Sequence, residues 1–172
     1  MTMTILAYQD FLQVAARKLQ DPALINRRSA LLIVNFERLA ELDGILGFAV
    51  VDKILTQVSN QLKAALNTEA LVGTTGRYQV SCLLSDLLTD AHAMLAAHKI
   101  LRVLALPFVL DRRNIILAPR IGVALKNNAS ATLEQLMSNA SSAVRQARLA
   151  QESIKLFAAE TEDPLHFQID LW

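Results

Sequence analysis

ALLIVNFERLAELDGILGFAVVDKIL, residues Ala30–Leu55, is the stretch that decides the fold. It begins inside a short apolar run, Ser29–Phe36, whose length and β-branched residues predict a strand buried on both faces. Glu37–Leu46 follows as a connector of helical character, with a turn bracketed by Gly44 and Gly47. A buried strand followed by helical segments predicts an α/β protein.

The clearest helix in the chain is predicted at Phe48–Leu66, where the apolar residues fall on one stripe at helical spacing. Two short connections, Gly76-Arg77 and Asp111-Arg112-Arg113, predict β-hairpins. The other predicted helices are Tyr8–Leu19, Thr89–Leu104 and Thr132–Ala150 (capped by Ser130 or Thr132), and the other predicted strands are Ala70–Thr75, Tyr78–Leu84, Pro107–Leu110, Asn114–Leu125 and Ile154–Phe157. This order predicts a mixed sheet packed by helices, not a doubly wound parallel sheet.

Length and composition restrict the class of protein. The chain has 172 residues, 53% of them apolar and 19% charged, which predicts one globular domain. A net charge of +1 with scattered charges argues against nucleic-acid binding by phosphate neutralisation. The sequence has no apolar run of the roughly 18 residues that a membrane span requires, and no basic segment ahead of an apolar one. With one cysteine, Cys82, predicted to be a buried hydrophobe, these features predict a cytoplasmic protein.

Residue chemistry alone predicts no active site. The histidines, His92, His98 and His166, have no second histidine or cysteine at metal-ligand spacing. The sequence contains no glycine-rich phosphate loop, no serine in a nucleophile-elbow context and no pair of carboxylates that stands out as an acid/base couple. The function must therefore be sought in a resemblance, which covers roughly residues 5–157.

Several segments, taken in chain order, resemble GGDEF domains, the family that includes the diguanylate cyclases. In the opening stretch, Gly47 and Asp52 match the family's Gly-His-x-x-Gly-Asp segment, with Phe48 and Val51 in place of the histidine and the second glycine. LVGTTGRYQVSCLL, Leu71–Leu84, occupies the place of the hairpin that carries the family signature.

The signature itself is replaced by Gly76, Arg77, Tyr78, Gln79 and Val80. Ile121–Ala124 is similar to the family's Ser-Ile-Gly-Ile-Ala strand, and Ala143–Phe157 to its last helix and strand. No motif is intact, so the resemblance depends on common order and spacing. It implies an α/β fold of the α+β type, with a central mixed, mostly antiparallel sheet of about five strands flanked by helices.

The resemblance also implies the loss of catalysis. In active members, two carboxylates hold two Mg²⁺ ions on GTP, one at the end of the first strand and one as the third signature residue. The neutral residues Asn35 and Tyr78 stand at these positions, and only the Phe36 carbonyl is left. Because hard cations prefer charged oxygen ligands, we expect no metal site, no cofactor and no synthesis of cyclic di-GMP.

Other family positions in the nucleotide site are partly kept. Asp43 and Asp52 stand where the family reads guanine, at the family's spacing from Asn35. Arg148 stands where the family has a phosphate-binding lysine, and Glu152 replaces a nearby arginine. The family's inhibitory Arg-x-x-Asp motif is absent, since residues 67–70 read NTEA, so feedback by the product is not expected there.

Plainer interpretations of these residues remain open. Asp52 would also suit the start of a helix, where the helix dipole favours a negative charge. Arg148 would also suit a solvated helix face, and Tyr78 and Gln79 would suit any hairpin.

Residues 1–157 are thus interpreted as a degenerate GGDEF domain and residues 158–172 as a C-terminal tail or linker, in which the alternation Leu165–Leu171 is typical of an edge strand. The resemblance implies a regulatory or interaction module that tunes an EAL-type cyclic-di-GMP phosphodiesterase domain, on the same polypeptide or on a partner protein. A GTP sensor without turnover is the alternative, and a cyclase with rearranged chemistry a distant third. GTP and a second copy of the chain are the other partners considered, without nucleic acid or membrane insertion.

Overall fold

The computed structural model describes residues 5–126 and 130–158. Its elements are α1 (Tyr8–Leu19), β1 (Arg28–Asn35), α2 (Glu37–Leu46), α3 (Phe48–Ala65), β2 (Leu71–Gly76), β3 (Gln79–Leu87), α4 (Asp90–Leu104), β4 (Phe108–Leu110), β5 (Arg113–Ile115), β6 (Arg120–Lys126), α5 (Leu133–Ala150) and β7 (Ile154–Leu156). The helices and most of the strands lie within two residues of their predicted bounds. The predicted edge strand in the tail lies outside the described residues.

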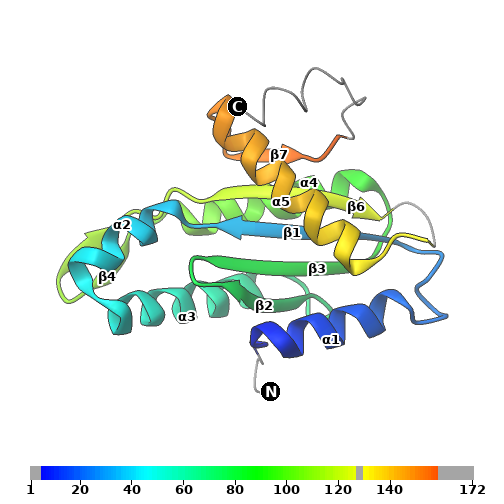
Figure 1. Ribbon diagram of the computed structural model, residues 1–172, viewed down its shortest axis with the longest axis horizontal. Helices are drawn as coiled ribbons and strands as arrows, with labels where there is room; N and C mark the ends of the chain where they lie inside the picture. Colours follow the sequence, from blue (N-terminus) through cyan, green and yellow to red (C-terminus); the bar gives the residue numbers. More distant parts are fainter. Residues whose placement is uncertain (1–4, 127–129, 159–172) are drawn as a thin grey trace, which may run out of the picture.

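A five-stranded sheet forms the centre of the molecule, in the order β2-β3-β1-β6-β7 (Figure 1). β1 pairs antiparallel with β3 on one side and with β6 on the other, and only β6 and β7 run parallel. The side chains from Ser29 to Val34 in β1 are all buried, as predicted for a strand covered on both faces. The predicted mixed, mostly antiparallel sheet is confirmed.

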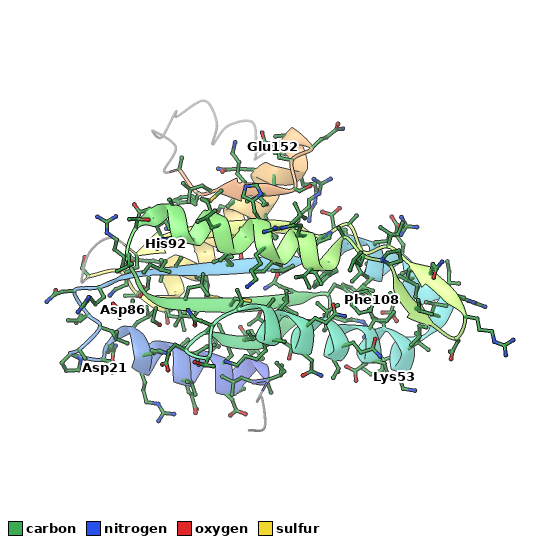
Figure 2. All side chains as sticks on the ribbon, turned by 180° about the vertical axis from the view of Figure 1, so that it is seen from behind. Asp21, Lys53, Asp86, His92, Phe108 and Glu152 are labelled. Atoms are coloured by element: carbon green, nitrogen blue, oxygen red, sulfur yellow. The ribbon has the colours of Figure 1, made fainter. Side chains whose placement is uncertain are left out.

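Helices cover both faces of this sheet. α5 crosses in front of the sheet in Figure 1, and α4 lies in front of it in Figure 2, which is seen from behind. One core cluster joins α3 and α4 to residues such as Leu32, and the other joins α1 and α5 to residues such as Ile33. Since neighbouring residues of a strand point to opposite faces, β1 supplies both cores.

α5 lies against β6 at a point of very close approach. A Cβ atom on Gly122 would lie 2.2 Å from the carbonyl oxygen of Ala140 and 2.8 Å from the backbone nitrogen of Val144. At the start of α5, Thr132 and Gln135 form a capping box, which identifies Thr132 rather than Ser130 as the N-cap.

α1 is held to the β2 side of the sheet. Phe11, Ala15 and Leu19 are its buried residues, and Phe11 fills the space that a side chain on Gly73 would occupy. Just before α1, Leu6 pairs with β2 as an isolated parallel bridge, with hydrogen bonds from Leu6 N to Val72 O and from Thr74 N to Leu6 O, both 3.0 Å long.

Three predicted details are wrong. Gly44 lies within α2, and only Gly47, with φ +88°, marks the break between α2 and α3. The first hairpin turns at Arg77-Tyr78, one residue later than predicted, because Gly76 pairs with Gln79 at the end of the ladder.

The third detail is the strand predicted at Asn114–Leu125, which is two strands of different sheets. β5 pairs with β4 in a separate two-stranded sheet, while β6 joins the central sheet. Pro119 lacks the N–H that a continuous ladder requires, and Ala118 before it has φ +45°.

Among the described residues, no helix combines the length and the hydropathy needed to cross a bilayer. Cys82 is fully buried as predicted, and burial raises the pKa of its thiol to about 12.

Candidate functional site

The turn that replaces the family signature lies beside the end of the central strand. Arg77 and Tyr78 form the turn between β2 and β3, and β3 pairs Gln79 with Asn35 at the end of β1. The backbone N–H of Phe36 donates to the Tyr78 carbonyl at 2.8 Å. The sheet thus brings together the two positions, 35 and 78, at which active relatives are expected to hold metal.

Asp43 on α2 joins this turn through a three-residue cluster, the Asp43 cluster (Asp43, Arg77 and Tyr78). The Tyr78 hydroxyl donates to Asp43 Oδ2 at 2.6 Å, and Arg77 Nε donates to the same oxygen at 2.7 Å. A second guanidinium nitrogen, Nη2, forms an ion pair with it, and the Asp43 side chain is only 12% exposed. One carboxylate therefore binds both residues of the turn, and charge-assisted hydrogen bonds of this kind are the stronger ones.

The cluster shifts the acidity of its members. The Tyr78 hydroxyl, and then the Arg77 guanidinium, lower the pKa of Asp43 below its ordinary 3.8 by stabilising the carboxylate. The same hydrogen bond raises the pKa of Tyr78 above 10.0, because a phenolate would face the Asp43 carboxylate. The hydrogen bond between Tyr78 and Asp43 is therefore intact at any pH between the lowered pKa of Asp43 and the raised pKa of Tyr78.

A cavity of about 300 Å³ adjoins the Asp43 cluster on the α3 side. Its lining residues are Phe48, Val51, Asp52, Leu55, Thr74, Gly76 and Arg77. The Arg77 guanidinium lies 4.5 Å from the centroid of the Phe48 ring, a cation–π distance. Asp52, expected at the guanine position, thus lines an apolar hollow that Arg77 borders.

Arg148 lies elsewhere, in a second ion-pair cluster, the Glu37 cluster (Glu37, Arg120 and Arg148). Arg148 Nε donates to Glu37 Oε1, and Arg120 Nε lies 3.7 Å from the same oxygen. Arg120 also donates from Nη1 to the Glu152 carbonyl at 2.8 Å. The cation expected to bind phosphate is paired with an internal carboxylate, and it does not line the cavity that contains Asp52.

The other signature positions serve the hairpin itself. Gly76 ends β2, Val80 is fully buried in the core, and Gln79 Nε2 donates to Thr75 Oγ1 at 3.0 Å. The Thr75 and Ser81 hydroxyls are 2.6 Å apart across the hairpin. These contacts stabilise the turn from within.

The oxygen atoms available at this site are poor ligands for Mg²⁺. Asn35 offers a neutral amide, and the Tyr78 hydroxyl is committed to Asp43. Asp43 is the nearby carboxylate, but two donors already occupy its Oδ2. In residues 5–126 and 130–158, no three or more His, Cys, Asp or Glu side chains form a group that could hold a metal ion. Hard divalent cations need several charged oxygens, so the geometry does not fit the pair of ions that the family's chemistry requires.

Sequence reasoning missed Glu37, Arg120 and the contact between Arg77 and Phe48. Arg148 and Glu37 are 111 residues apart, so no local pattern relates them. The available signal was indirect: a basic residue such as Arg148 is expected to attract a carboxylate from a neighbouring element.

The fold defines the class of protein: a diguanylate-cyclase-like α/β domain. The family profile described as "Diguanylate cyclase, GGDEF domain" matches residues 2–153. The chain belongs to the GGDEF family.

Two curated relatives come from Pseudomonas aeruginosa. The chain is 24% identical over 138 residues to cyclic di-GMP phosphodiesterase NbdA, a match covering 80% of this chain and 18% of NbdA. It is 28% identical over 151 residues to diguanylate cyclase TpbB, covering 87% of this chain and 34% of TpbB. The chain thus spans about a third or less of the length of these relatives.

Solved structures agree with the family. The GGDEF domain of TpbB superposes with a TM-score of 0.80 at 24% identity, covering 91% of this chain and 99% of that one. An EAL/GGDEF domain protein from M. capsulatus gives a TM-score of 0.71 at 26% identity, covering 77% of this chain and 86% of that one.

The Asp43 cluster gives a prediction for pH titration. Asp43→Asn should lower the pKa of Tyr78 toward 10.0, because a neutral amide no longer opposes the phenolate. In the parent chain, the stability that this bond contributes is fully present from above the lowered pKa of Asp43 up to pH 10.0, and it is lost as the pH rises through the raised pKa of Tyr78. Tyrosinate absorbance in a Tyr8→Phe background isolates Tyr78, since the chain has two tyrosines. Equal midpoints with and without Asp43→Asn would contradict the cluster.

Proposed function

We propose that the chain is a catalytically inactive, cytoplasmic GGDEF module of cyclic-di-GMP signalling that regulates a linked EAL phosphodiesterase domain. The observation that carries the proposal is the Asp43 cluster. The residue at the metal position, Tyr78, donates to the residue at the guanine position, Asp43, at 2.6 Å. The side chains at two positions that the family uses for metal and guanine are thus bound to each other.

The electrostatics of the site support the absence of turnover. Phosphoryl transfer depends on cations that offset the charge developing on the phosphates. Asn35 and Tyr78 supply no charged metal ligand, and Glu37 pairs with Arg148 and Arg120. Removing one stabilising group typically costs about 10²–10³ in rate, so the combined losses should abolish catalysis.

The regulatory part of the proposal draws on the relatives. NbdA is named as a cyclic di-GMP phosphodiesterase, and the M. capsulatus protein as an EAL/GGDEF domain protein. A GGDEF unit therefore stands beside phosphodiesterase function in similar proteins. A module without turnover can still act on such a domain by contact, if it binds two conformations of that domain with different affinities.

The first test is an assay for cyclic di-GMP. The purified chain with GTP and Mg²⁺ should form no product above a blank, while the TpbB GGDEF domain, the positive control, should form it. Chromatography with mass detection measures the product. Synthesis by this chain at a rate within about a hundredfold of the control would overturn the proposed inactivity.

The second test addresses regulation. The chain is fused to an EAL domain from a GGDEF–EAL protein in place of that protein's own GGDEF unit, and hydrolysis of cyclic di-GMP is compared with that of the isolated EAL domain. We expect the rates to differ at least twofold. Arg77→Ala, which removes the guanidinium from Asp43 and leaves only the Tyr78 hydroxyl as its partner in the Asp43 cluster, should change the rate of the fusion. Arg112→Ala at the tip of the β4–β5 hairpin should not change it. Equal rates for the fusion and the isolated domain would argue against tuning.

A GTP sensor without turnover is the second candidate, and the cavity that Asp52 lines is the observation in its favour. Its volume of about 300 Å³ is at the lower end of small-molecule sites. Calorimetric titration with GTP, with and without Mg²⁺, tests it. If GTP binds there, Asp52→Ala should weaken binding about tenfold or more, while Asp10→Ala on α1 should not. No heat up to millimolar GTP would exclude the sensor.

A further inference from the structure

A second hollow, the hairpin hollow, lies between the break of α2 and α3 and the β4–β5 hairpin. Its volume is about 310 Å³, and Figure 1 shows β4 next to α2 at one end of the molecule. The apolar residues that line it are Ile45, Leu46, Val50, Leu110 and Ile115. The hairpin hollow shares no lining residue with the cavity beside the Asp43 cluster, so it is a separate site.

The wall of the hairpin hollow is apolar and continuous with the core. In the β4–β5 ladder Leu110 pairs with Arg113, and Ile115 lies two residues further along the same strand, so these side chains share one face of the hairpin. Ile115 is buried, and Leu46, Val50 and Leu110 pack against the core cluster that includes it. An apolar group that enters the hollow is therefore removed from water on several sides.

Two exposed side chains of opposite charge, Asp111 and Arg113, also line the hairpin hollow. Within residues 5–126 and 130–158, neither side chain makes a hydrogen bond or an ion pair, whether with the other or with a third group. One rim of the hollow thus offers a carboxylate that accepts hydrogen bonds and a guanidinium that donates them. Both groups are available to a ligand.

An apolar wall beside two opposite charges is complementary to a free amino acid with an apolar side chain. The α-carboxylate would pair with Arg113, the α-ammonium group with Asp111, and the side chain would enter the hollow. A ligand with a carboxylate alone would face the like charge of Asp111, and an amine alone would face Arg113. The volume corresponds to about ten water molecules at roughly 30 Å³ each, which suits leucine or phenylalanine.

We propose that the hairpin hollow binds a free α-amino acid with an apolar side chain, of the size of leucine or phenylalanine. Small-molecule sites combine an apolar wall with a few charged groups that orient the ligand, as this hollow does. Leu46 follows Asp43 by three residues on α2, so an occupied hollow would lie about one helical turn from the Asp43 cluster. The inference does not depend on the proposed regulation, and its test needs neither GTP nor an EAL domain.

An NMR titration of the ¹⁵N-labelled chain tests the site. L-Leucine and L-phenylalanine should shift the amide signals of Leu46, Val50, Leu110 and Ile115 saturably, with a Kd between about 10 µM and 1 mM. Leucinamide lacks the carboxylate and 4-methylpentanoate lacks the ammonium group, so each should bind at least about fivefold more weakly than L-leucine. Glycine has no apolar side chain and should cause no saturable shift.

Substitutions on the hairpin assign the two charges. Arg113→Gln and Asp111→Asn should each raise the Kd for L-leucine at least about fivefold. Asparagine tolerates the φ of +49° at position 111, so the turn should keep its shape. Arg113→Gln should also remove the preference for L-leucine over leucinamide, which a loss of structure alone would not do. The matched control is Arg112→Gln, because Arg112 lies between the two residues but does not line the hollow, and its Kd should stay within about twofold of the parent value.

Three results would overturn the proposal. The first is the absence of a saturable shift with L-leucine and L-phenylalanine at about 10 mM. The second is equal affinity for L-leucine, leucinamide and 4-methylpentanoate, because the hollow would then accept apolar groups without recognising their charges. The third is an unchanged Kd for L-leucine in both Arg113→Gln and Asp111→Asn.

Discussion

Gly122→Ala is expected to destabilise the protein by about 3 kcal/mol, the upper end of the usual cost of overpacking, because the atoms that the new methyl group meets belong to the backbone. The added methyl carbon would lie 2.2 Å from the Ala140 carbonyl oxygen and 2.8 Å from the Val144 nitrogen. Both are backbone atoms of α5, so no side chain can rotate away, and the helix must move off the sheet. Urea unfolding followed by circular dichroism measures the loss as a lower midpoint at unchanged slope.

Gly44→Ala is the matched control for this substitution. Gly44 lies within α2, and a Cβ there would meet no atom within 4 Å. Alanine should therefore stabilise the protein by about 0.5–1 kcal/mol, because it reduces the entropy of the unfolded chain and favours the helix. If both substitutions had the same effect, the close packing of α5 against β6 would be wrong.

Phe11→Ala is expected to cost about 3–5 kcal/mol, the usual range for emptying a buried aromatic site. The Phe11 ring is fully buried and lies over Gly73. Glycine has no side chain that could fill the space left when the ring is removed. The loss of stability should affect α1 first, because the other buried residues of this helix, Ala15 and Leu19, are smaller. Hydrogen exchange should show α1 amides exchanging much faster, together with a lower urea midpoint.

Tyr8→Ala provides the comparison on the same helix. Tyr8 is 48% exposed, so its removal should cost less than about 1 kcal/mol. A Phe11→Ala variant as stable as Tyr8→Ala would show that α1 does not depend on this contact.

Periodicity and turn chemistry predict most of the fold because each acts over a few residues. α1 and α3 follow from apolar residues at helical spacing, and the central strand from an uninterrupted apolar run. The same local reasoning joined Asn114–Leu125 into one strand, since apolar residues continue through positions 115–118. Pro119 was the visible signal of a break, and the separate sheet that β5 forms with β4 is a tertiary outcome.

The candidate site is less accessible to such reasoning. Position-by-position resemblance found Asp43, Tyr78 and Arg148, but not which of them meet. Asp43 and Arg77 are 34 residues apart, so no local pattern relates them, and Arg77 lies in a hairpin turn one residue later than predicted. The Glu37 cluster joins the start of α2, the start of β6 and the end of α5, three places that only the folded sheet brings together.

The strand-like segment around Leu6 has a mechanical consequence. Its two hydrogen bonds to β2 lie roughly perpendicular to the chain. A force that pulls on residue 5 along the chain therefore loads both bonds at once, in shear, and does not break them one after the other. β2 leads directly to the turn that holds Arg77 and Tyr78. A force applied at this end of the chain is therefore carried directly to β2, the strand that leads into the turn at Arg77 and Tyr78.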